Sequence, residues 1–124
     1  MLVKSNNSQD DWKLTHKIFE ASERKIDFDD YVKRWDDSTI YFITVDSVHI
    51  GYVQITPRNE IGYFIIPKFQ GKGYGKKAVR ELMEREDRKY YWVMIPKNHE
   101  QSIKFITKLG FEKSGDVYAI NKKT

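Results

Sequence analysis

The sequence predicts a mixed α+β fold, built on a twisted and mostly antiparallel sheet of about six to seven strands with about four helices. Three observations support this prediction. Runs of β-branched and aromatic residues alternate with segments of helical periodicity along the chain. The 124 residues match the usual length of one domain, and the 40% hydrophobic residues suffice for one core. We therefore expect a single domain over residues 1–124.

The predicted strands are apolar runs, rich in β-branched and aromatic residues, that end at turn residues. Asp46-Ser47 separates two of them and predicts a hairpin. Pro67 ends the third long strand, because proline has no N–H for a central ladder. The predicted strands cover residues 2–4, 39–45, 48–56, 60–66, 90–95, 111–115 and 117–121.

The predicted helices show apolar residues recurring on one face. The pair Asn98 and Gln101 resembles a capping box, and Gly110 offers a left-handed C-cap. The helices cover residues 10–22, 28–35, 73–88 and 98–110. One of them lies between the long strands at 60–66 and 90–95, which predicts that these two central strands are parallel.

Composition excludes several classes of protein. The chain has no cysteine, which excludes disulfide frameworks, zinc–thiolate sites and thiol catalysis. The three histidines are not spaced as a metal cluster, so no metal is expected. With no apolar run of signal-peptide or membrane-span length, we expect a cytoplasmic protein without membrane association. The formal charge of +4 is weak evidence alone, but four lysines between Lys68 and Lys77 suggest an anion site there.

The segment Gln70-Gly71-Lys72-Gly73-Tyr74-Gly75-Lys76 joins a predicted strand to a predicted helix. Backbone N–H groups and the positive end of the helix dipole converge in such a loop, which is suited to phosphate. Two familiar phosphate motifs do not fit. A dinucleotide fingerprint needs glycine or alanine where Lys76 stands, and a nucleotide P-loop needs serine or threonine where Lys77 stands. A flexible turn with solvated lysines is the alternative.

Two motifs make the chain resemble the GNAT superfamily of N-acetyltransferases. Gln70 to Gly75 is similar to the family's Arg/Gln-x-x-Gly-x-Gly/Ala signature, and Asn98 to Phe111 is similar to its second motif, Asn-x-x-x-Ser-Ile-x-Phe-Tyr-x-Lys-x-Gly-Phe. The motifs and the elements around them cover about half of the chain. The resemblance implies a GNAT-like fold in which the two central parallel strands splay apart.

The resemblance also implies that acetyl-CoA binds where these strands part. Its pyrophosphate would lie on the loop formed by Gln70, Gly71, Lys72, Gly73, Tyr74, Gly75 and Lys76. The pantetheine arm would pair with the backbone around Phe64, Ile65 and Ile66, and the Ile65 N–H would polarise the thioester carbonyl. Asn98 would hydrogen-bond the pantetheine, with Ser102 and Phe105 beside it. Each of these three residues has an alternative role, as a helix cap, a solvent-facing residue and a core aromatic.

The chemistry implied by the resemblance is direct attack of a primary amine on acetyl-CoA in a ternary complex. A typical amine is protonated at neutral pH and must lose a proton first. Glu60 is the candidate base, because a glutamate on this strand serves that role in similar enzymes; a solvated hairpin carboxylate is the alternative. Ile106 stands where many members carry a tyrosine acid, so Tyr118 or water would have to replace it.

We therefore expect an acetyl-CoA-dependent N-acetyltransferase for a small-molecule or peptide amine, acting as a monomer or homodimer. A non-catalytic acyl-CoA-binding module of the same fold is the alternative, favoured by Ile106. A domain that binds nucleic acid through Lys68 to Lys77 is a third alternative, but no nucleic-acid partner is expected. The acidic first third of the chain suggests a cationic acceptor. The alternative is that these charges only keep the helices soluble.

Overall fold

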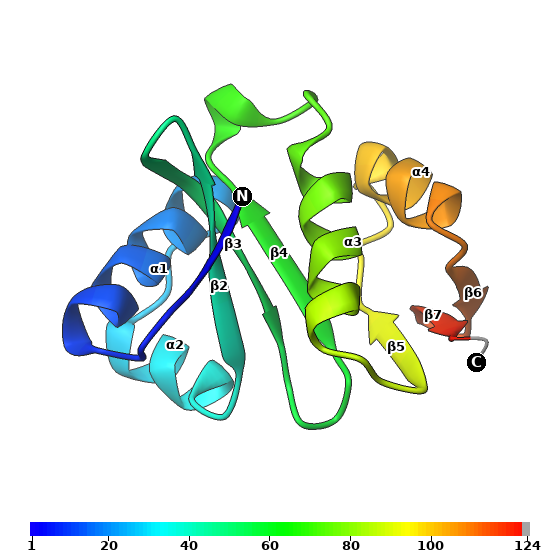
Figure 1. The fold of residues 1–124 in the computed structure, drawn as a ribbon, viewed down its shortest axis with the longest axis horizontal. Helices are drawn as coiled ribbons and strands as arrows, with labels where there is room; N and C mark the ends of the chain where they lie inside the picture. Colours follow the sequence, from blue (N-terminus) through cyan, green and yellow to red (C-terminus); the bar gives the residue numbers. More distant parts are fainter. Residues whose placement is uncertain (123–124) are drawn as a thin grey trace.

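The computed structural model describes residues 1–122, which form seven strands and four α-helices, and it confirms the α+β class (Figure 1). In chain order the elements are β1 (Leu2–Lys4), α1 (Gln9–Ser22), α2 (Phe28–Trp35), β2 (Thr39–Val45), β3 (Val48–Ile55), β4 (Ile61–Ile65), the 3₁₀ helix η1 (Pro67–Phe69), α3 (Tyr74–Arg85), β5 (Tyr90–Val93), α4 (Glu100–Lys108), β6 (Glu112–Ser114) and β7 (Val117–Asn121).

The strands form two sheets that meet at one point. The first sheet has the order β1-β2-β3-β4 and the second the order β5-β7-β6, and all pairs within them are antiparallel. A parallel bridge between Glu60 and Trp92 joins the start of β4 to β5, and the Trp92 N–H donates to the Asn59 carbonyl at 3.0 Å. Beyond this bridge β4 and β5 belong to separate sheets and diverge, as the resemblance implies for the two central strands.

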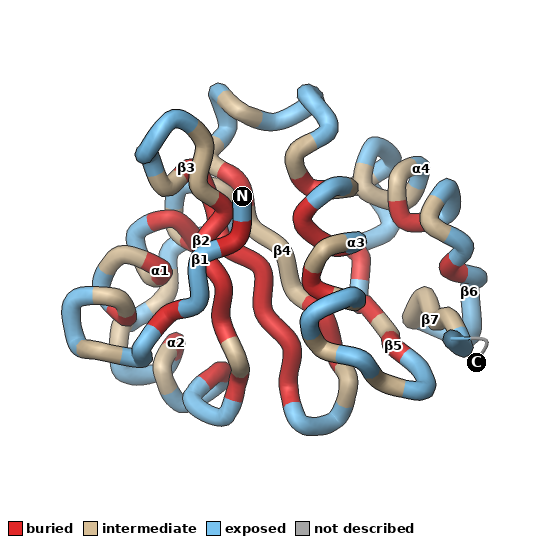
Figure 2. The backbone as a smooth tube through the Cα atoms, in the orientation of Figure 1, coloured by how far each residue is buried: buried red, intermediate tan, exposed pale blue. Residues whose placement is uncertain are grey.

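The helices cover both faces of the first sheet (Figure 1). Because side chains alternate along a strand, β4 sends Ile61 and Ile65 to the face under α3 and Phe64 to the face under α1 and α2. Two hydrophobic clusters result, and Figure 2 shows the buried strands β2 and β3 between them. Each fully buried isoleucine contributes about 1.5–3 kcal/mol to the stability of this core.

The β2–β3 hairpin fixes the register of the first sheet. Asp46 and Ser47 both have positive φ, 50° and 66°, which is the geometry of a two-residue type I′ turn. Gly51 of β3 lies opposite Ile65 of β4, and a Cβ at Gly51 would come within 2.3 Å of the Phe64 carbonyl oxygen. A glycine is therefore required where β3 and β4 approach most closely.

Several predicted boundaries need correction. The helix predicted over 73–88 ends at Arg85, because Glu86 makes the last helical hydrogen bond and the Arg88 N–H donates instead to the Tyr91 hydroxyl. The strand predicted over 90–95 ends at Val93. Strand β4 begins at Ile61, and Pro67 opens the short helix η1, which the sequence analysis did not predict.

The predicted capping box of the last helix is wrong. Helix α4 begins after His99, and its first turn has no side-chain cap. This start places Gln101 at the second helical position, whereas a capping box needs the residue at the third. The predicted left-handed cap at Gly110 is confirmed, with a φ of 103°. In the described residues 1–122, no helix is long and apolar enough to cross a membrane.

Candidate active site

The open edge of β4 is the backbone feature around which the site is built. The Ile66 N–H donates to the Ile50 carbonyl and the Thr56 N–H donates to the Glu60 carbonyl, at 2.9 and 3.0 Å. In an antiparallel ladder these pairs alternate, so the even-numbered residues of 60–66 direct their backbone groups to β3. The odd-numbered residues direct theirs toward β5, from which β4 diverges. The Ile65 N–H therefore points to the open edge, whereas the backbones of Phe64 and Ile66 pair with β3.

Side chains from three elements meet on the α3 side of this edge. A Cβ at Gly75 would lie 3.3 Å from Ile65 and 3.4 Å from Phe105, so β4, α3 and α4 pack closely here. The Tyr63 ring contacts Phe105, with 4.8 Å between the ring centroids. The structure thus brings together Ile65, Gly75 and Phe105, which the sequence analysis assigned to one site.

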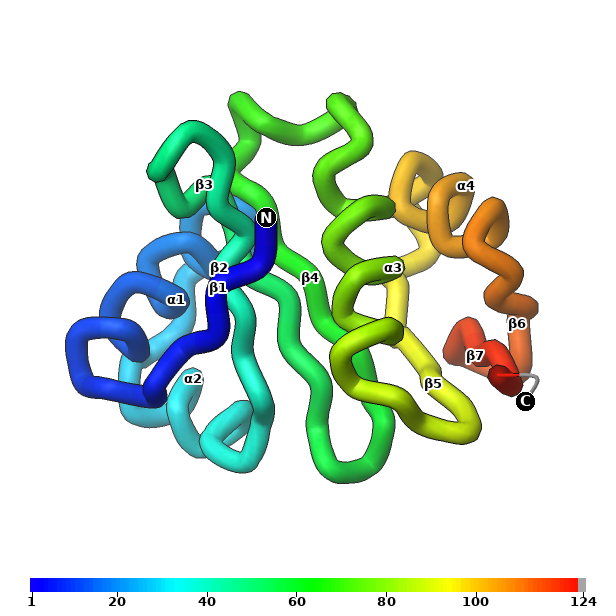
Figure 3. The backbone as a smooth tube through the Cα atoms, viewed as in Figure 1, coloured from blue at the N-terminus to red at the C-terminus, as the bar shows by residue number. Residues whose placement is uncertain are grey.

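The glycine loop connects β4 to α3 in an arch (Figure 3). Gly71 and Gly73 have φ of 75° and 86°, which a residue with a Cβ rarely adopts. The Gln70 side chain donates from Nε2 to the Ile65 carbonyl at 2.8 Å, so this motif residue ties the loop to the open edge of β4. A Cβ at Gly71 would lie 3.2 Å from the Gln101 amide, which places the start of α4 beside the loop.

The N-terminus of α3 differs from those of α1 and α2. Ser8 and Asp27 cap α1 and α2 with side-chain hydrogen bonds, and acidic residues occupy their first turns. Helix α3 starts at Gly73 with no side-chain cap and no acidic residue in its first turn. Its first backbone N–H groups have no helical partner and carry the positive end of the dipole. These groups can bind an anion.

Lysines surround this uncapped helix end. Lys68 and Lys72 both lie near the Phe69 ring, with their Nζ atoms 5.2 and 5.9 Å from its centroid. Lys76 is in the first turn of α3 itself, half-buried, and the neighbouring ring of Tyr74 packs edge-on to Phe69. The loop is thus electropositive and stiffened by two aromatic rings.

The predicted residues of the second motif lie at different depths. Phe105 and Ser102 are half-buried on α4, whereas Asn98 is exposed in the turn before it. Burial raises the pKa of Tyr63 to about 12, with a hydrogen bond from Ser102 partly opposing the shift. Tyr63 therefore stays protonated at neutral pH. Ile106 is fully buried in the core, so its side chain is a packing element.

Glu60 lies on the opposite face of β4, under α2. Its side chain is 7% exposed, and the Arg34 guanidinium of α2 donates to its two oxygens at 3.3 and 3.4 Å. Arg34 in turn lies 3.9 Å over the Trp35 ring. The Glu60 N–H donates to Thr56 Oγ1, which fixes the start of β4. The carboxylate is therefore held in place by both backbone and side-chain contacts.

Three residues of this region escaped sequence analysis. Arg34 and Gln54 belong to other elements of the chain. Only the folded structure places Arg34 beside Glu60 and Gln54 beside Gly62. Tyr63 belongs to the strand already assigned to the site, and its alternation with Phe64 was the available signal. Within residues 1–122, histidine, aspartate and glutamate form no group of three or more that could hold a metal ion.

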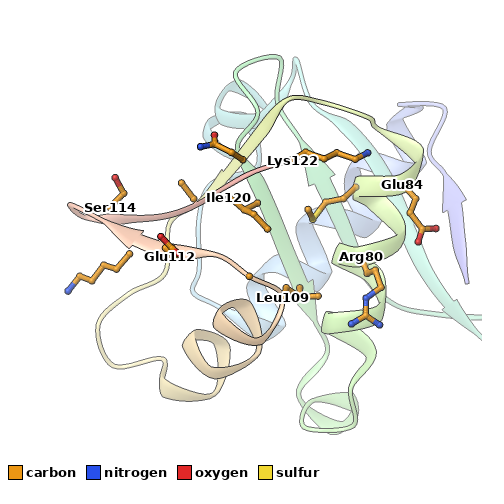
Figure 4. A pocket seen from close by; sticks show the side chains of 12 residues that line it. Arg80, Glu84, Leu109, Glu112, Ser114, Ile120 and Lys122 are labelled. Carbon is orange, nitrogen blue, oxygen red and sulfur yellow. The ribbon is translucent and has the colours of Figure 1, made fainter. Parts of the chain in front are cut away.

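A separate hollow of about 880 Å³ lies between α3 and the β6–β7 hairpin (Figure 4). Leu109 and Ile120 contribute apolar surface, and Arg80, Glu112 and Lys122 contribute charges. None of the residues assigned to the site by sequence lines this hollow.

Comparison with known proteins identifies the family of the chain. A sequence model of the Acetyltransferase (GNAT) family matches residues 8–111, and the chain therefore belongs to the GNAT family of acetyltransferases. A search of curated proteins by sequence found no match.

Solved structures share the fold. The ribosomal-protein-S18-alanine N-acetyltransferase from Escherichia coli superposes with a TM-score of 0.82 at 11% identity, covering 100% of this chain and 96% of that one. The spermidine N-acetyltransferase from Vibrio cholerae, in complex with CoA and spermine, superposes with a TM-score of 0.75 at 14% identity, covering 97% and 95%. A GCN5-related N-acetyltransferase structure from Rhodopseudomonas palustris gives a TM-score of 0.79 at 14% identity, covering 98% and 95%.

Proposed function

We propose that this protein transfers the acetyl group of acetyl-CoA to a primary amine, with residues 1–124 acting as one domain. The observation that carries this proposal is the open edge of β4 lying beside the uncapped N-terminus of α3, in a member of the GNAT family. One neighbouring structure contains CoA, and two neighbours are named for acetylating an alanine of a protein and spermidine, which are both amines.

The glycine loop fits the pyrophosphate of acetyl-CoA. The Gly71, Gly73 and Gly75 backbones and the free N–H groups of α3 supply hydrogen-bond donors, while Lys72 and Lys76 supply positive charge. Nothing lies within 4 Å of a Cβ built at Gly73, so the loop is open at this point. Phe105 and Ser102 then flank the pantetheine arm from α4, and Asn98 reaches it from the preceding turn.

The open edge of β4 fits the rest of the acetyl donor. Because the Phe64 and Ile66 backbones are paired with β3, their proposed contribution is to hold Ile65 in place. The Ile65 N–H is the donor that stabilises the oxyanion developing on the thioester carbonyl. When bound, acetyl-CoA supplies an activated acyl carbon at this point.

Glu60 prepares the acceptor on the other side of β4. It accepts a proton from the ammonium group, directly or through water, to give the neutral amine. The amine nitrogen bonds to the acyl carbon as the carbon–sulfur bond breaks, and the nitrogen loses a second proton as the amide forms. The CoA thiolate takes up one proton, so the overall reaction releases one proton. Arg34 keeps the Glu60 carboxylate in position for this role.

A non-catalytic acyl-CoA-binding module is the second candidate. It is favoured by Ile106, which lies fully buried in the position where the family's motif carries a tyrosine acid. In the catalytic proposal, water protonates the thiolate in its place. The two candidates share the same binding loop and differ in whether Glu60 is needed for turnover.

The test compares Glu60→Gln with the wild-type protein. We expect kcat to fall by about 10²–10⁴-fold at neutral pH, while acetyl-CoA binds as before, because the substitution removes the base and keeps the shape. Glu84→Gln, an exposed carboxylate on α3, is the matched control and should leave both quantities unchanged. Equal turnover of Glu60→Gln and wild type would remove Glu60 as the base. An inactive wild type that binds acetyl-CoA would favour the binding module.

A further inference from the structure

Gln54 is a fully buried amide with no hydrogen-bond partner among the described residues. It lies near the end of β3, opposite Ile40 of β2 and Gly62 of β4, and is 0% exposed. Both Oε1 and Nε2 lack a partner. Buried side-chain amides are nearly always paired, because an unpaired one loses its hydration without compensation. A core position of this kind is expected to hold an apolar residue unless the amide has a ligand.

Gln54 lies on the same face of the sheet as the Glu60 carboxylate. Glu60 and Gly62 are two residues apart on β4, and their side-chain positions share the face under α1 and α2. A Cβ at Gly62 would lie 3.1 Å from Gln54 Nε2, so the amide lies directly beside the glycine. The Gln54 amide occupies the space above Gly62, and a residue with a Cβ at this position would push against it.

This part of β4 is reached by solvent. Gly62 and Phe64 are both half-buried, whereas their partners on β3 are fully buried. The amide is therefore separated from the accessible surface by the Gly62 backbone and the Phe64 ring. For Gln54 to meet a group bound between Glu60 and the open edge of β4, its side chain must rotate past Gly62 and the Phe64 ring.

We propose that Gln54 positions the acceptor, and that the acceptor is an amine with a neighbouring amide group, as at the N-terminus of a peptide. This inference rests on the proposed function. The unpaired amide offers one acceptor oxygen and two N–H donors. A peptide N-terminus satisfies both, because its amine donates to Oε1 and its first carbonyl accepts from Nε2. A polyamine offers donors alone and leaves Nε2 unpaired.

The charges around Gln54 agree with this acceptor. Glu60 is already paired with Arg34, so the local charge is balanced and attracts a second ammonium group poorly. Some acidic residues of the first third have other contacts in the structure. Asp11 accepts hydrogen bonds from Ser5, Asp27 caps α2, and Asp37 pairs with Arg58. These three carboxylates therefore have structural roles that involve no acceptor.

The test compares trialanine amide with spermidine as acceptors for wild type and Gln54→Met. We expect wild type to prefer the peptide, and Gln54→Met to raise the KM for the peptide by about 10–100-fold, which corresponds to the loss of two hydrogen bonds. The KM for spermidine and the binding of acetyl-CoA should change little. Gln9→Met, an exposed glutamine on α1, is the matched control.

Thermal unfolding separates this role from a structural one. If the Gln54 amide is unpaired in the free protein because it binds the acceptor, Gln54→Met should raise Tm by roughly 2–8 °C. The substitution then removes an unpaired buried polar group. If the amide instead holds an internal water that supports the core, Tm should fall and both acceptors should be affected equally. That result would overturn the inference while leaving the proposed function standing.

Binding gives a readout that needs no turnover. Calorimetric titration of trialanine amide into CoA-saturated wild type should show binding that Gln54→Met weakens. Acetylation of spermidine alone, unaffected by Gln54→Met, would contradict the inference and retain the acetyltransferase. Failure of wild type to acetylate either amine, with intact peptide binding that depends on Gln54, would contradict the proposed turnover and support the binding role.

Discussion

Burial changes the pKa of the Tyr63 phenol on β4. Its ring packs between β4 and Phe105 of α4, and burial raises its pKa to about 12. Burial also raises the pKa of Tyr52, whose hydroxyl accepts a 2.7 Å hydrogen bond from Tyr31. These phenols remain neutral in the folded protein at pH values where an unfolded tyrosine ionises.

The sign of the resulting pH dependence follows from proton binding. Below pH 10 both states hold the proton, and the contribution of Tyr63 to stability is fully present. Between pH 10 and 12 the unfolded state loses the proton first, so the free energy of unfolding falls by at most about 1.4 kcal/mol per pH unit for this group. We expect Tyr63→Phe to flatten this decline in urea unfolding at pH 9 and 11. The exposed Tyr90→Phe is the control, and parallel declines of Tyr63→Phe and wild type would contradict the shift.

Site residues differed in how far the sequence could predict them. The loop from Gln70 to Gly75 and the strand before it are contiguous, so an anion site could be proposed from the residues and a cofactor role from the resemblance of the motif. The Arg34–Glu60 pair joins residues 26 positions apart, and the position of Gln54 depends on the register of β3 against β4. Contacts between residues so far apart along the chain are set by the tertiary structure, and local sequence patterns do not predict them.

At the scale of elements, the sequence located strands and helices well and their ends less well. Asp46-Ser47 and Gly110 were predictable because left-handed turns need particular residues. The end of α3 at Arg85 depends on a tertiary contact, because the Arg88 N–H donates to the Tyr91 hydroxyl of β5, and the start of α4 after His99 has no capping side chain to mark it. Hydrophobic periodicity continues past such points and gives no signal of them.

The pairing of β3 with β4 holds the candidate site in place, and its stability can be tested at Gly51. Gly51→Ala places a Cβ 2.3 Å from the Phe64 carbonyl oxygen, so one of the strands must shift. We expect a loss of about 1–3 kcal/mol or more in the free energy of unfolding, measured with urea. Gly115→Ala, at an open turn with a φ of 62°, should cost less. Equal stability of Gly51→Ala and wild type would contradict the observed register.

In the proposed function, the acetyl donor and the acceptor use opposite faces of one strand, β4. The α3 face of β4 adjoins the glycine loop and α4, and the α1–α2 face carries Glu60, Gly62 and Gln54. The divergence of β4 from β5 leaves the Ile65 N–H between these faces. In the proposed reaction, donor and acceptor meet at this backbone group while binding to separate elements.

The central claim is that the glycine loop and α3 bind acetyl-CoA, and calorimetric titration of acetyl-CoA tests it most directly. We predict micromolar binding to wild type and at least about tenfold weaker binding to Gly73→Glu, whose carboxylate would repel the pyrophosphate. Gly115→Glu is the matched control, because its φ is also positive and no atom lies within 4 Å of its Cβ position. Wild-type affinity retained in folded Gly73→Glu, or no binding to folded wild type, would contradict the account.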